Sequence, residues 1–252
     1  MIGIGSPAFC QTPFLNMAEL ISEEFELWEI LSEGEDRLEL ARDGIGYARD
    51  SLGMKFQVHA PLSDVNIGSV YEPMRRAALN EIKQTILMCH QLEIPLVTVH
   101  PGFVQGIAFL DRTRALEMTK VSVKEIASFA ADHDVTVVLE NLPANINGTC
   151  TSASELLEAI GDTGIGICFD LGHANTAGQI EEFLEIVDRF GNVHLHNNQG
   201  KWDQHNQIDD GSADIAKVVS VLKKAYRGNM IIESTDLESG VSSKKTLEKL
   251  LD

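Results

Sequence analysis

Short apolar runs alternate with longer amphipathic runs along the whole chain. Eight apolar runs have the length and composition of β-strands, and they lie at residues 2–6, 26–31, 56–61, 96–101, 136–141, 166–171, 193–197 and 230–234. The segments between them have a helical period, most clearly EPMRRAALNEIKQTILMCHQLE (72–93) and TRALEMTKVSVKEIASFAADHD (113–134). Eight β units and eight α units without a Pro-rich or Ser-rich linker predict one α/β domain over residues 1–252, folded as a single (β/α)8 TIM barrel.

An open, doubly wound sheet is the alternative architecture, but such a sheet usually has fewer strands and a Gly-rich phosphate loop. The stretches GIGSPAF (3–9) and GIGYAR (44–49) contain only part of that glycine fingerprint. Helix starts are expected at Ser152 and Ser212, whose side chains suit an N-cap. A helix end is expected at Gly191-Asn192.

The alternation of strand side chains predicts which of them point into the barrel. In VHLH (193–196), Val193 and Leu195 are expected to face the helices, so that His194 and His196 face inward. The same phase puts polar residues at the C-terminal ends of other strands, where barrel enzymes build their active sites. Together with the loops that follow, the predicted mouth contains His59, His100, Glu140, Asp170, His173, His194, Asp203, His205 and Glu233.

This set of residues indicates a metal site. A single inward histidine would most simply be a core residue, but that explanation does not extend to nine His, Asp and Glu residues at one end of a barrel. Four carboxylates in one pocket would repel one another, and at least one would be forced neutral without a cation. Imidazole and carboxylate ligands suit Zn²⁺, Mn²⁺, Fe²⁺ or Co²⁺. We therefore expect a bound divalent metal ion.

Charge and composition indicate which classes of binding partner are expected. The formal net charge is −18, whereas proteins that bind a phosphate backbone usually carry clustered Lys and Arg, so nucleic acid is disfavoured. No apolar run approaches the length of a membrane span, and the first residues lack the basic region of a signal peptide. The four cysteines form no CxxC pair and suit a reducing compartment. We expect a cytoplasmic protein with no membrane partner, as a monomer or a homo-oligomer.

Seven stretches, in this order along the chain, resemble the xylose-isomerase-like TIM-barrel superfamily. They are VHAPL (58–62), VTVHPG (97–102), VLEN (138–141), CFDLGHA (168–174), VHLHNN (193–198), DQHNQIDDGSADI (203–215) and IIES (231–234). The superfamily groups sugar isomerases and epimerases with type IV apurinic endonucleases. The resemblance covers the whole chain and is specific for the superfamily, but much less so for any one member.

The isomerase and epimerase members imply one metal ion, Zn²⁺ or Mn²⁺, held by Glu140, Asp170, His194 and Glu233. The resemblance further implies proton transfer by the two glutamates through a metal-stabilised enediolate of a small sugar, sugar phosphate or polyol. His173 is expected to polarise a substrate oxygen. Residues expected to contact the substrate are His59, His196, Lys201 and Trp202. The alternative role for Trp202 is to pack its own loop down.

The endonuclease members imply a second interpretation, a phosphodiesterase with three zinc ions acting on DNA. Its further ligands correspond to His59, His100, His173, Asp203 and His205, so one to three metal ions are expected per chain. A third interpretation is a metal-dependent binding protein without turnover. Asn197 stands where an Asp is usual in the family, which removes a charge beside His194, but the retention of both Glu140 and Glu233 favours catalysis.

Overall fold

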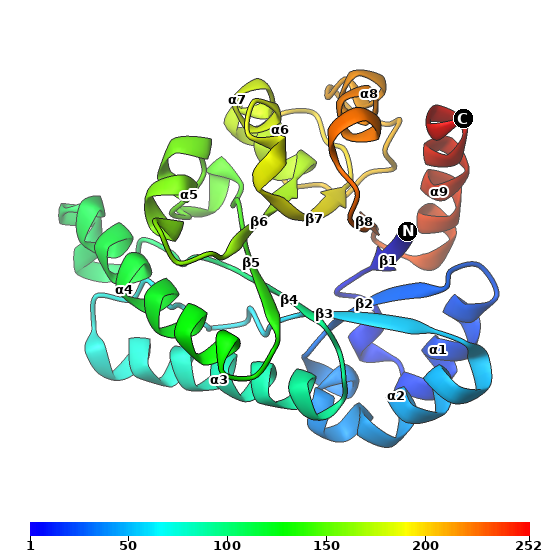
Figure 1. Cartoon of the computed structure of the whole chain (residues 1–252). Coiled ribbons are helices and arrows are strands. Elements are labelled where there is room, and N and C mark those ends of the chain that lie inside the picture. The colour runs from blue at the N-terminus through cyan, green and yellow to red at the C-terminus, as the bar shows by residue number, and fades with distance from the viewer.

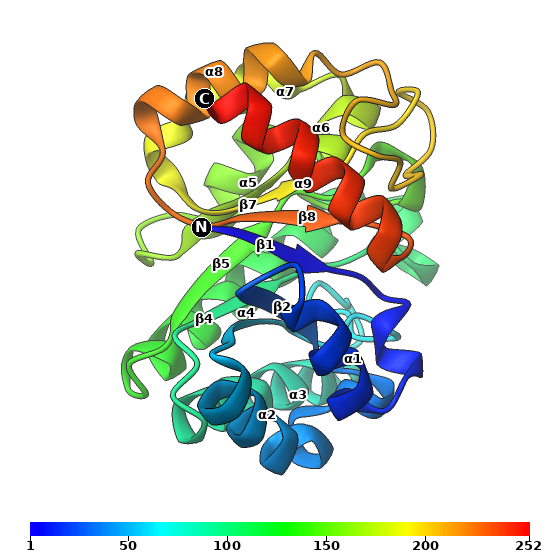
Figure 2. The ribbon, with the colours of Figure 1, turned by 90° about the vertical axis from the view of Figure 1, so that its right-hand side faces the viewer.

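Eight parallel strands form a closed barrel in the computed structural model, which describes residues 1–252 (Figure 1). Each strand pairs with its neighbours in sequence, and β1 closes the ring against β8, as the side view of Figure 2 shows. The strands are β1 (Ile2–Gly5), β2 (Leu27–Leu31), β3 (Lys55–His59), β4 (Leu96–Val99), β5 (Thr136–Glu140), β6 (Gly166–Asp170), β7 (Phe190–Leu195) and β8 (Met230–Glu233). The predicted (β/α)8 TIM barrel is confirmed, and the open-sheet alternative is wrong.

Helices connect the strands and surround the barrel. They are α1 (Phe14–Ser22), α2 (Leu38–Leu52), α3 (Glu72–Gln91), α4 (Arg112–Ala131), α5 (Ala153–Ile160), α6 (Leu171–Ala177), α7 (Ile180–Leu184), α8 (Ile215–Ala225) and α9 (Leu237–Leu251). Two short helices, α6 and α7, share the connection between β6 and β7, so there is one helix more than the eight expected. None of the helices combines the length and apolarity that a bilayer crossing requires.

Helix boundaries test the predicted caps one by one. Ser152 caps α5 as expected, because its hydroxyl accepts a hydrogen bond from the backbone N–H of Glu155 at 3.3 Å. The prediction for Ser212 is wrong, since Asp214 caps α8 instead. The helix end expected at Gly191-Asn192 is also wrong, because both residues belong to β7. Backbone pairing with β6 decides this boundary, and a glycine signal within one segment cannot anticipate such pairing.

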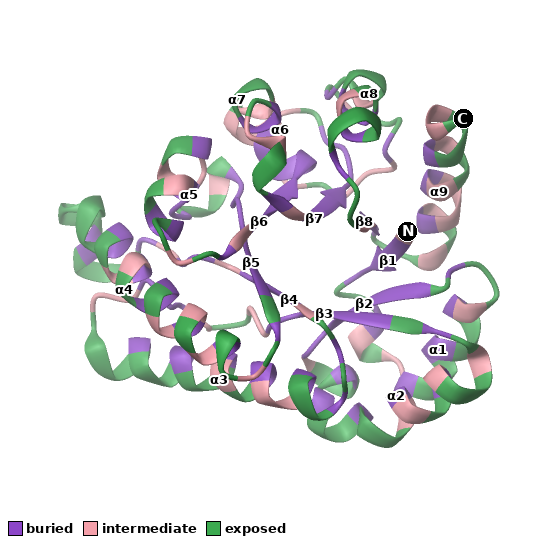
Figure 3. Cartoon of the chain, viewed as in Figure 1, coloured by how far each residue is buried: buried purple, intermediate pink, exposed green.

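The main hydrophobic core lies between the outside of the barrel and the helices, where Figure 3 shows buried residues on the strands and on one side of each long helix. Trp28 of β2 is fully buried and stacks on Phe14 of α1, with ring centroids 4.8 Å apart. Phe169 of β6 stacks on Phe190 of β7 at the same distance, 4.8 Å. Because these large side chains point outward, the alternate residues of the same strands must point into the barrel.

A buried carboxyl group lies in the short 3₁₀ helix η2 (Gly34–Asp36), between β2 and α2. Asp36 is 1% exposed, and neither of its carboxyl oxygens has a hydrogen-bond partner. Burial, with a smaller contribution from the charge of Glu35, raises the pKa of Asp36 to about 7. The unfolded chain releases this proton near pH 4, so the folded state loses stability as the pH rises from about 4 through 7.

Replacing Trp28 by alanine is expected to lower the free energy of unfolding by about 3–5 kcal/mol, because the change leaves a cavity against three aromatic rings. Urea denaturation followed by circular dichroism measures the loss. The matched control is Leu40→Ala on the solvent side of α2, where the side chain is 68% exposed and the expected change is within about 0.5 kcal/mol. Equal losses in the two variants would contradict this description of the core.

Asp36→Asn is expected to stabilise the protein at pH 8 by about 1–3 kcal/mol, since the amide never has to bear a buried charge. At pH 5 the wild-type carboxyl group already holds its proton, so little gain is expected there. Urea denaturation at both pH values measures the difference, with Asp43→Asn on the exposed side of α2 as control. A gain of the same size at pH 5 would show that Asp36 is not the titrating group.

Candidate metal centre

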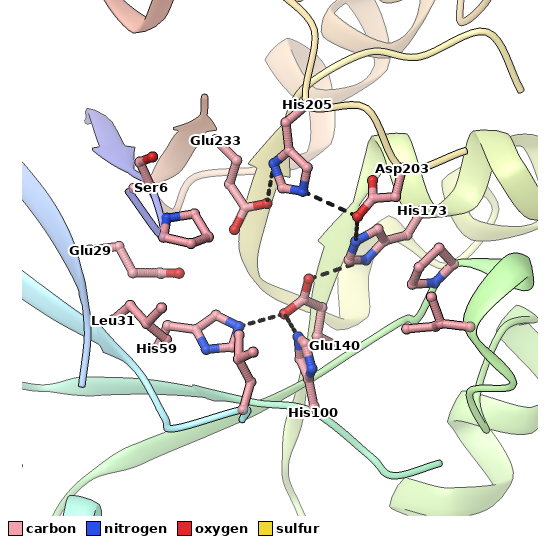
Figure 4. Close-up of a pocket in the computed structure, with 15 residues that line it drawn as sticks. Ser6, Glu29, Leu31, His59, His100, Glu140, His173, Asp203, His205 and Glu233 are labelled. Atoms are coloured by element: carbon pink, nitrogen blue, oxygen red, sulfur yellow. Dashed lines mark hydrogen bonds and ion pairs between the residues drawn. The ribbon is translucent and has the colours of Figure 1, made fainter. Parts of the chain in front are cut away.

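A cavity of about 240 Å³ opens at the C-terminal ends of the strands (Figure 4). Side chains from β2, β3, β5 and β8 and from the loops after the other strands converge on it. Its lining consists of Gly5, Ser6, Pro7, Glu29, Leu31, His59, Leu62, His100, Glu140, Pro143, Ile146, His173, Asp203, His205 and Glu233. The polar part of this lining contains only imidazole, carboxyl and hydroxyl groups, without a Lys or Arg side chain.

Glu140 lies at the centre of the cavity floor, at the end of β5. One carboxylate oxygen, Oε2, is 3.1 Å from Nε2 of His59 and 3.3 Å from Nε2 of His100. The other, Oε1, is 3.3 Å from Nδ1 of His173 and 3.5 Å from Nδ1 of His194. Burial by itself would raise the pKa of Glu140, but the imidazoles of His194, His100 and His173, with His194 first, hold that pKa well below its ordinary value. Glu140 is therefore an ionised carboxylate that several donor groups share.

The deepest donor group consists of Glu140, Asp170, His194 and Glu233, whose ligand atoms lie within 4.8 Å of one another. Nδ1 of His194 faces all three carboxylates, at 3.0 Å from Glu233 Oε1 and 3.9 Å from Asp170 Oδ2. Asp170 is held in place because it also caps α6, where Oδ1 accepts the backbone N–H of His173 at 2.6 Å. The start of α6 thus fixes one carboxylate, and its other oxygen remains directed at the group.

Two further donor groups flank the first. His59, His100 and Glu140 form one beside β3 and β4. His173, His196, Asp203 and His205 form the other at the rim, where Oδ2 of Asp203 is 3.1 Å from Nε2 of both His173 and His205. Burial opposes protonation of His205, but hydrogen bonding to Asp203 and nearby carboxylates outweigh it and raise the pKa of His205 to about 9. The third group therefore also combines imidazole with ionised carboxylate.

Several buried polar atoms in these groups have no hydrogen-bond partner, which is uncommon for buried polar atoms. They include Nδ1 of His100, His194 and His205, and one oxygen each of Asp170 and Asp203. Imidazole nitrogens and carboxylate oxygens that lie within 4.8 Å of one another match the donor chemistry of divalent transition metals. The residues present fit one ion in the deepest group, and the flanking groups offer donors for two more.

The structure brings together all nine residues that the sequence predicted at the mouth, and it separates two other predicted residues from them. His196, which was expected to contact the substrate, is fully buried within the donor group at the rim and stacks on His205, with ring centroids 4.1 Å apart, but it does not line the cavity. Lys201 and Trp202 lie exposed on the loop after β7, and neither lines the cavity. Trp202 is 66% exposed, so it neither packs the loop down closely nor reaches the donor groups.

Comparison with known proteins agrees with this geometry. A family model described as xylose isomerase-like TIM barrel matches residues 19–251. The chain belongs to the xylose isomerase-like TIM barrel family. Among sequence relatives of the family, the protein MJ1311 of Methanocaldococcus jannaschii is 33% identical, over 99% of this chain and 89% of that protein. A probable endonuclease 4 of Mycobacterium leprae is 28% identical, over 67% of this chain and 68% of the relative.

Solved structures are similar over nearly the whole chain. A crystal structure of a D-tagatose 3-epimerase-like protein has a TM-score of 0.92 and 30% identity, covering 99% of this chain and 96% of the other. A 3-keto-D-glucoside 4-epimerase from E. coli has a TM-score of 0.83 and 18% identity, with 98% of each chain covered. At that identity the second similarity shows the fold alone.

One residue of the site was missed by the sequence analysis. Glu29 of β2 is 2% exposed, and its Oε1 is 2.8 Å from Nε2 of His194. The signal was available, because Trp28 and Ile30 are typical outward residues and place Glu29 inward by alternation. The sequence analysis considered polar residues at the C-terminal ends of strands, whereas Glu29 lies in the middle of β2.

The role of Asn197 becomes clear from its hydrogen bonds. Its Nδ2 donates to the carbonyls of Ile208 and Ala213, at 2.9 and 3.1 Å, and its Oδ1 accepts the backbone N–H groups of Asn198 and Ala213. An aspartate could not donate to the two carbonyls. In this member of the family, Asn197 therefore braces the loop that carries Asp203 and His205, with no contact to His194.

Zn²⁺ or Mn²⁺ is expected to raise the thermal midpoint of chelator-treated protein, because an ion that binds only the folded state stabilises it, by about 2.7 kcal/mol at 100 times its Kd. Scanning calorimetry with and without the ion measures the shift. His194→Ala should lose most of the shift, whereas His90→Ala, which lies outside the donor groups, should keep it. An ion-induced shift of full size in His194→Ala would argue against the deepest group as the site.

Proposed function

We propose that the protein is a divalent-metal-dependent isomerase or epimerase of a small carbohydrate. The observation that carries the proposal is the pair Glu140 and Glu233, whose carboxylates approach the same Nδ1 of His194, at 3.5 and 3.0 Å, from β5 and β8. Two carboxylates that reach one cavity from different strands suit proton removal and proton return at neighbouring positions of one substrate. The similar D-tagatose 3-epimerase-like structure, at 30% identity, supports this assignment.

The side chains of the cavity have separate tasks in this reaction. One glutamate, Glu140 or Glu233, removes the proton from the carbon beside the substrate carbonyl. The opposite glutamate returns a proton on the other face of that carbon in an epimerase, or at the adjacent carbon in an isomerase. A bound divalent ion supplies Lewis-acid polarisation of substrate oxygens. His173 and His59 lie on either side of Glu140 and are suited to hold substrate hydroxyl groups in register with it.

The charges of the cavity favour an uncharged substrate. Five carboxylates lie in or directly below it, namely Glu29, Glu140, Asp170, Asp203 and Glu233. The lining offers no Lys or Arg to bind a phosphate group. Leu31, Leu62, Pro143 and Ile146 add an apolar side to the lining, which suits the C–H face of a sugar. Free sugars and polyols are therefore preferred to sugar phosphates.

A second candidate function, cleavage of a phosphodiester, is favoured by one specific observation. All three donor groups are complete, and three divalent ions would reverse the sign of the charge in the cavity. An anionic phosphate would then be attracted, and metal clusters of this kind activate water for phosphoester cleavage. The 28% identity to a probable endonuclease 4 of Mycobacterium leprae supports this candidate, whereas the net charge of −18 opposes contact with a duplex.

Metal-loaded protein is expected to incorporate deuterium from D₂O into one or more members of a panel of free ketopentoses and ketohexoses. Glu140→Gln and Glu233→Gln should each lower the rate by about 10²–10⁴-fold, because each removes a group that transfers a proton. Proton NMR of the sugars measures the exchange. The control Glu182→Gln changes an exposed carboxylate on α7 and should keep the wild-type rate.

The two candidate functions separate in a parallel assay. The same metal-loaded preparation is incubated with a duplex that contains one abasic site, and nicking is followed on a denaturing gel. The proposed isomerase or epimerase leaves the duplex intact. Nicking at catalytic enzyme levels without any deuterium exchange would replace the first candidate by the second.

A further inference from the structure

We infer that Glu29 is a positioning residue that fixes the ring of His194 so that its Nδ1 faces the metal site. The inference rests on the proposed metal site and adds to it a residue from inside the barrel. Oε1 of Glu29 is 2.8 Å from Nε2 of His194, and both side chains are buried, with exposures of 2% and 0%. Glu29 belongs to β2, whereas none of the residues in the deepest donor group comes from that strand.

The contact determines the tautomer of His194. An ionised carboxylate only accepts hydrogen bonds, so the proton between the two groups belongs to Nε2. A histidine ring that binds a metal is neutral, so its lone pair is then on Nδ1, which is the nitrogen that faces Glu140, Asp170 and Glu233. A histidine that binds a metal through one nitrogen commonly donates its other N–H to a carboxylate, which orients the ring and strengthens it as a ligand.

Glu29 is itself held as a pure acceptor by three buried donors. Its Oε2 accepts Nε2 of Gln57 in a short hydrogen bond, Nδ2 of Asn192 at 2.9 Å and the hydroxyl of Thr98 at 3.4 Å. Gln57 cannot reverse its amide freely, because its Oε1 accepts Nδ2 of Asn229 at 2.9 Å. These three donors hold Oε2 of Glu29 in place and leave Oε1 available for His194.

Asn192 could in principle compete for His194, since its Nδ2 lies 3.1 Å from Nε2. Its two amide hydrogens are already used, one toward Oε2 of Glu29 and one toward the hydroxyl of Thr98 at 3.2 Å. Nε2 of His194 therefore does not have to accept a hydrogen bond, which agrees with its role as donor to Glu29. Among the side chains of Glu29, Gln57, Thr98 and Asn192, only Oδ1 of Asn192 is left without a hydrogen-bond partner.

The composition of this layer is itself unusual. TIM barrels mostly fill their interior with branched apolar side chains, and a buried carboxylate costs free energy unless its charge is used. Here Glu29, Gln57, Thr98 and Asn192 occupy the interior directly below the donor groups, and each is at most 2% exposed. Apolar residues would stabilise the barrel equally well. We therefore attribute the polar character of this layer to its contact with His194.

The first test measures Zn²⁺ binding by competition with a chromogenic chelator. Glu29→Gln is expected to bind Zn²⁺ in the deepest site about 10–100-fold more weakly than wild type. The glutamine side chain has only one acceptor oxygen, so it cannot accept hydrogen bonds from Gln57, Asn192 and Thr98 and also from His194. Glu29→Asp keeps the charge and should bind Zn²⁺ more tightly than Glu29→Gln. Ser122→Ala, which removes buried hydrogen bonds to Ile67 and Arg75 in the helix layer, should keep wild-type affinity.

Folded Glu29→Gln with wild-type Zn²⁺ affinity and stoichiometry would overturn the inference. A second measurement uses the unaltered protein, so it decides the matter even where a variant does not fold. In long-range ¹H–¹⁵N spectra of the Zn²⁺-loaded protein, His194 is expected to show a protonated Nε2 and a metal-bound Nδ1. Metal on Nε2 would refute the role of Glu29.

Neither readout depends on turnover. Zn²⁺ binding with the expected pattern but no deuterium exchange would remove the proposed activity and leave the role of Glu29 intact. Wild-type protein that binds no Zn²⁺ would remove both.

Discussion

The mutual repulsion of buried carboxylates is the constraint on which the site depends. Glu140, Asp170 and Glu233 converge from three strands, and the first two are buried where water screens charges least. Imidazoles placed between them relieve part of this repulsion, which is why the pKa of Glu140 stays low despite burial. The arrangement needs positive charge to be stable. Because all strands of the barrel end on the same side, histidines from several strands can lie beside these carboxylates.

The outer core makes this concentration of charge possible. Large apolar side chains such as Trp28 and Phe169 are directed outward and buried under helices, so the stability of the fold does not depend on an apolar barrel interior. The interior is then free to hold polar groups such as Glu29 and Asn192. The alternation of side chains that buries the apolar residues outside the barrel therefore also places Glu29 and Asn192 beneath the site. A change in the register of β2 would disturb both the outer core and this contact.

The segments that follow β6 and β7 orient several side chains of the site. Asp170 links the end of β6 to the start of α6, so that the helix backbone orients a carboxylate of the site. Asn197 secures the long loop after β7 through four hydrogen bonds and thereby holds Asp203 and His205 over the cavity. His205 has a backbone φ of +49°, a conformation that costs free energy and that the braced loop maintains.

The sequence alone determined the barrel and the nine residues at its mouth, because strand alternation and the shared direction of parallel strands are properties that short segments encode. It did not determine which nitrogen of His194 faces the carboxylates, that Glu29 lies beneath it, or that Lys201 and Trp202 stay outside the cavity. Those features depend on distances between residues far apart in the chain. These distances are defined only when the barrel closes, with β1 paired to β8.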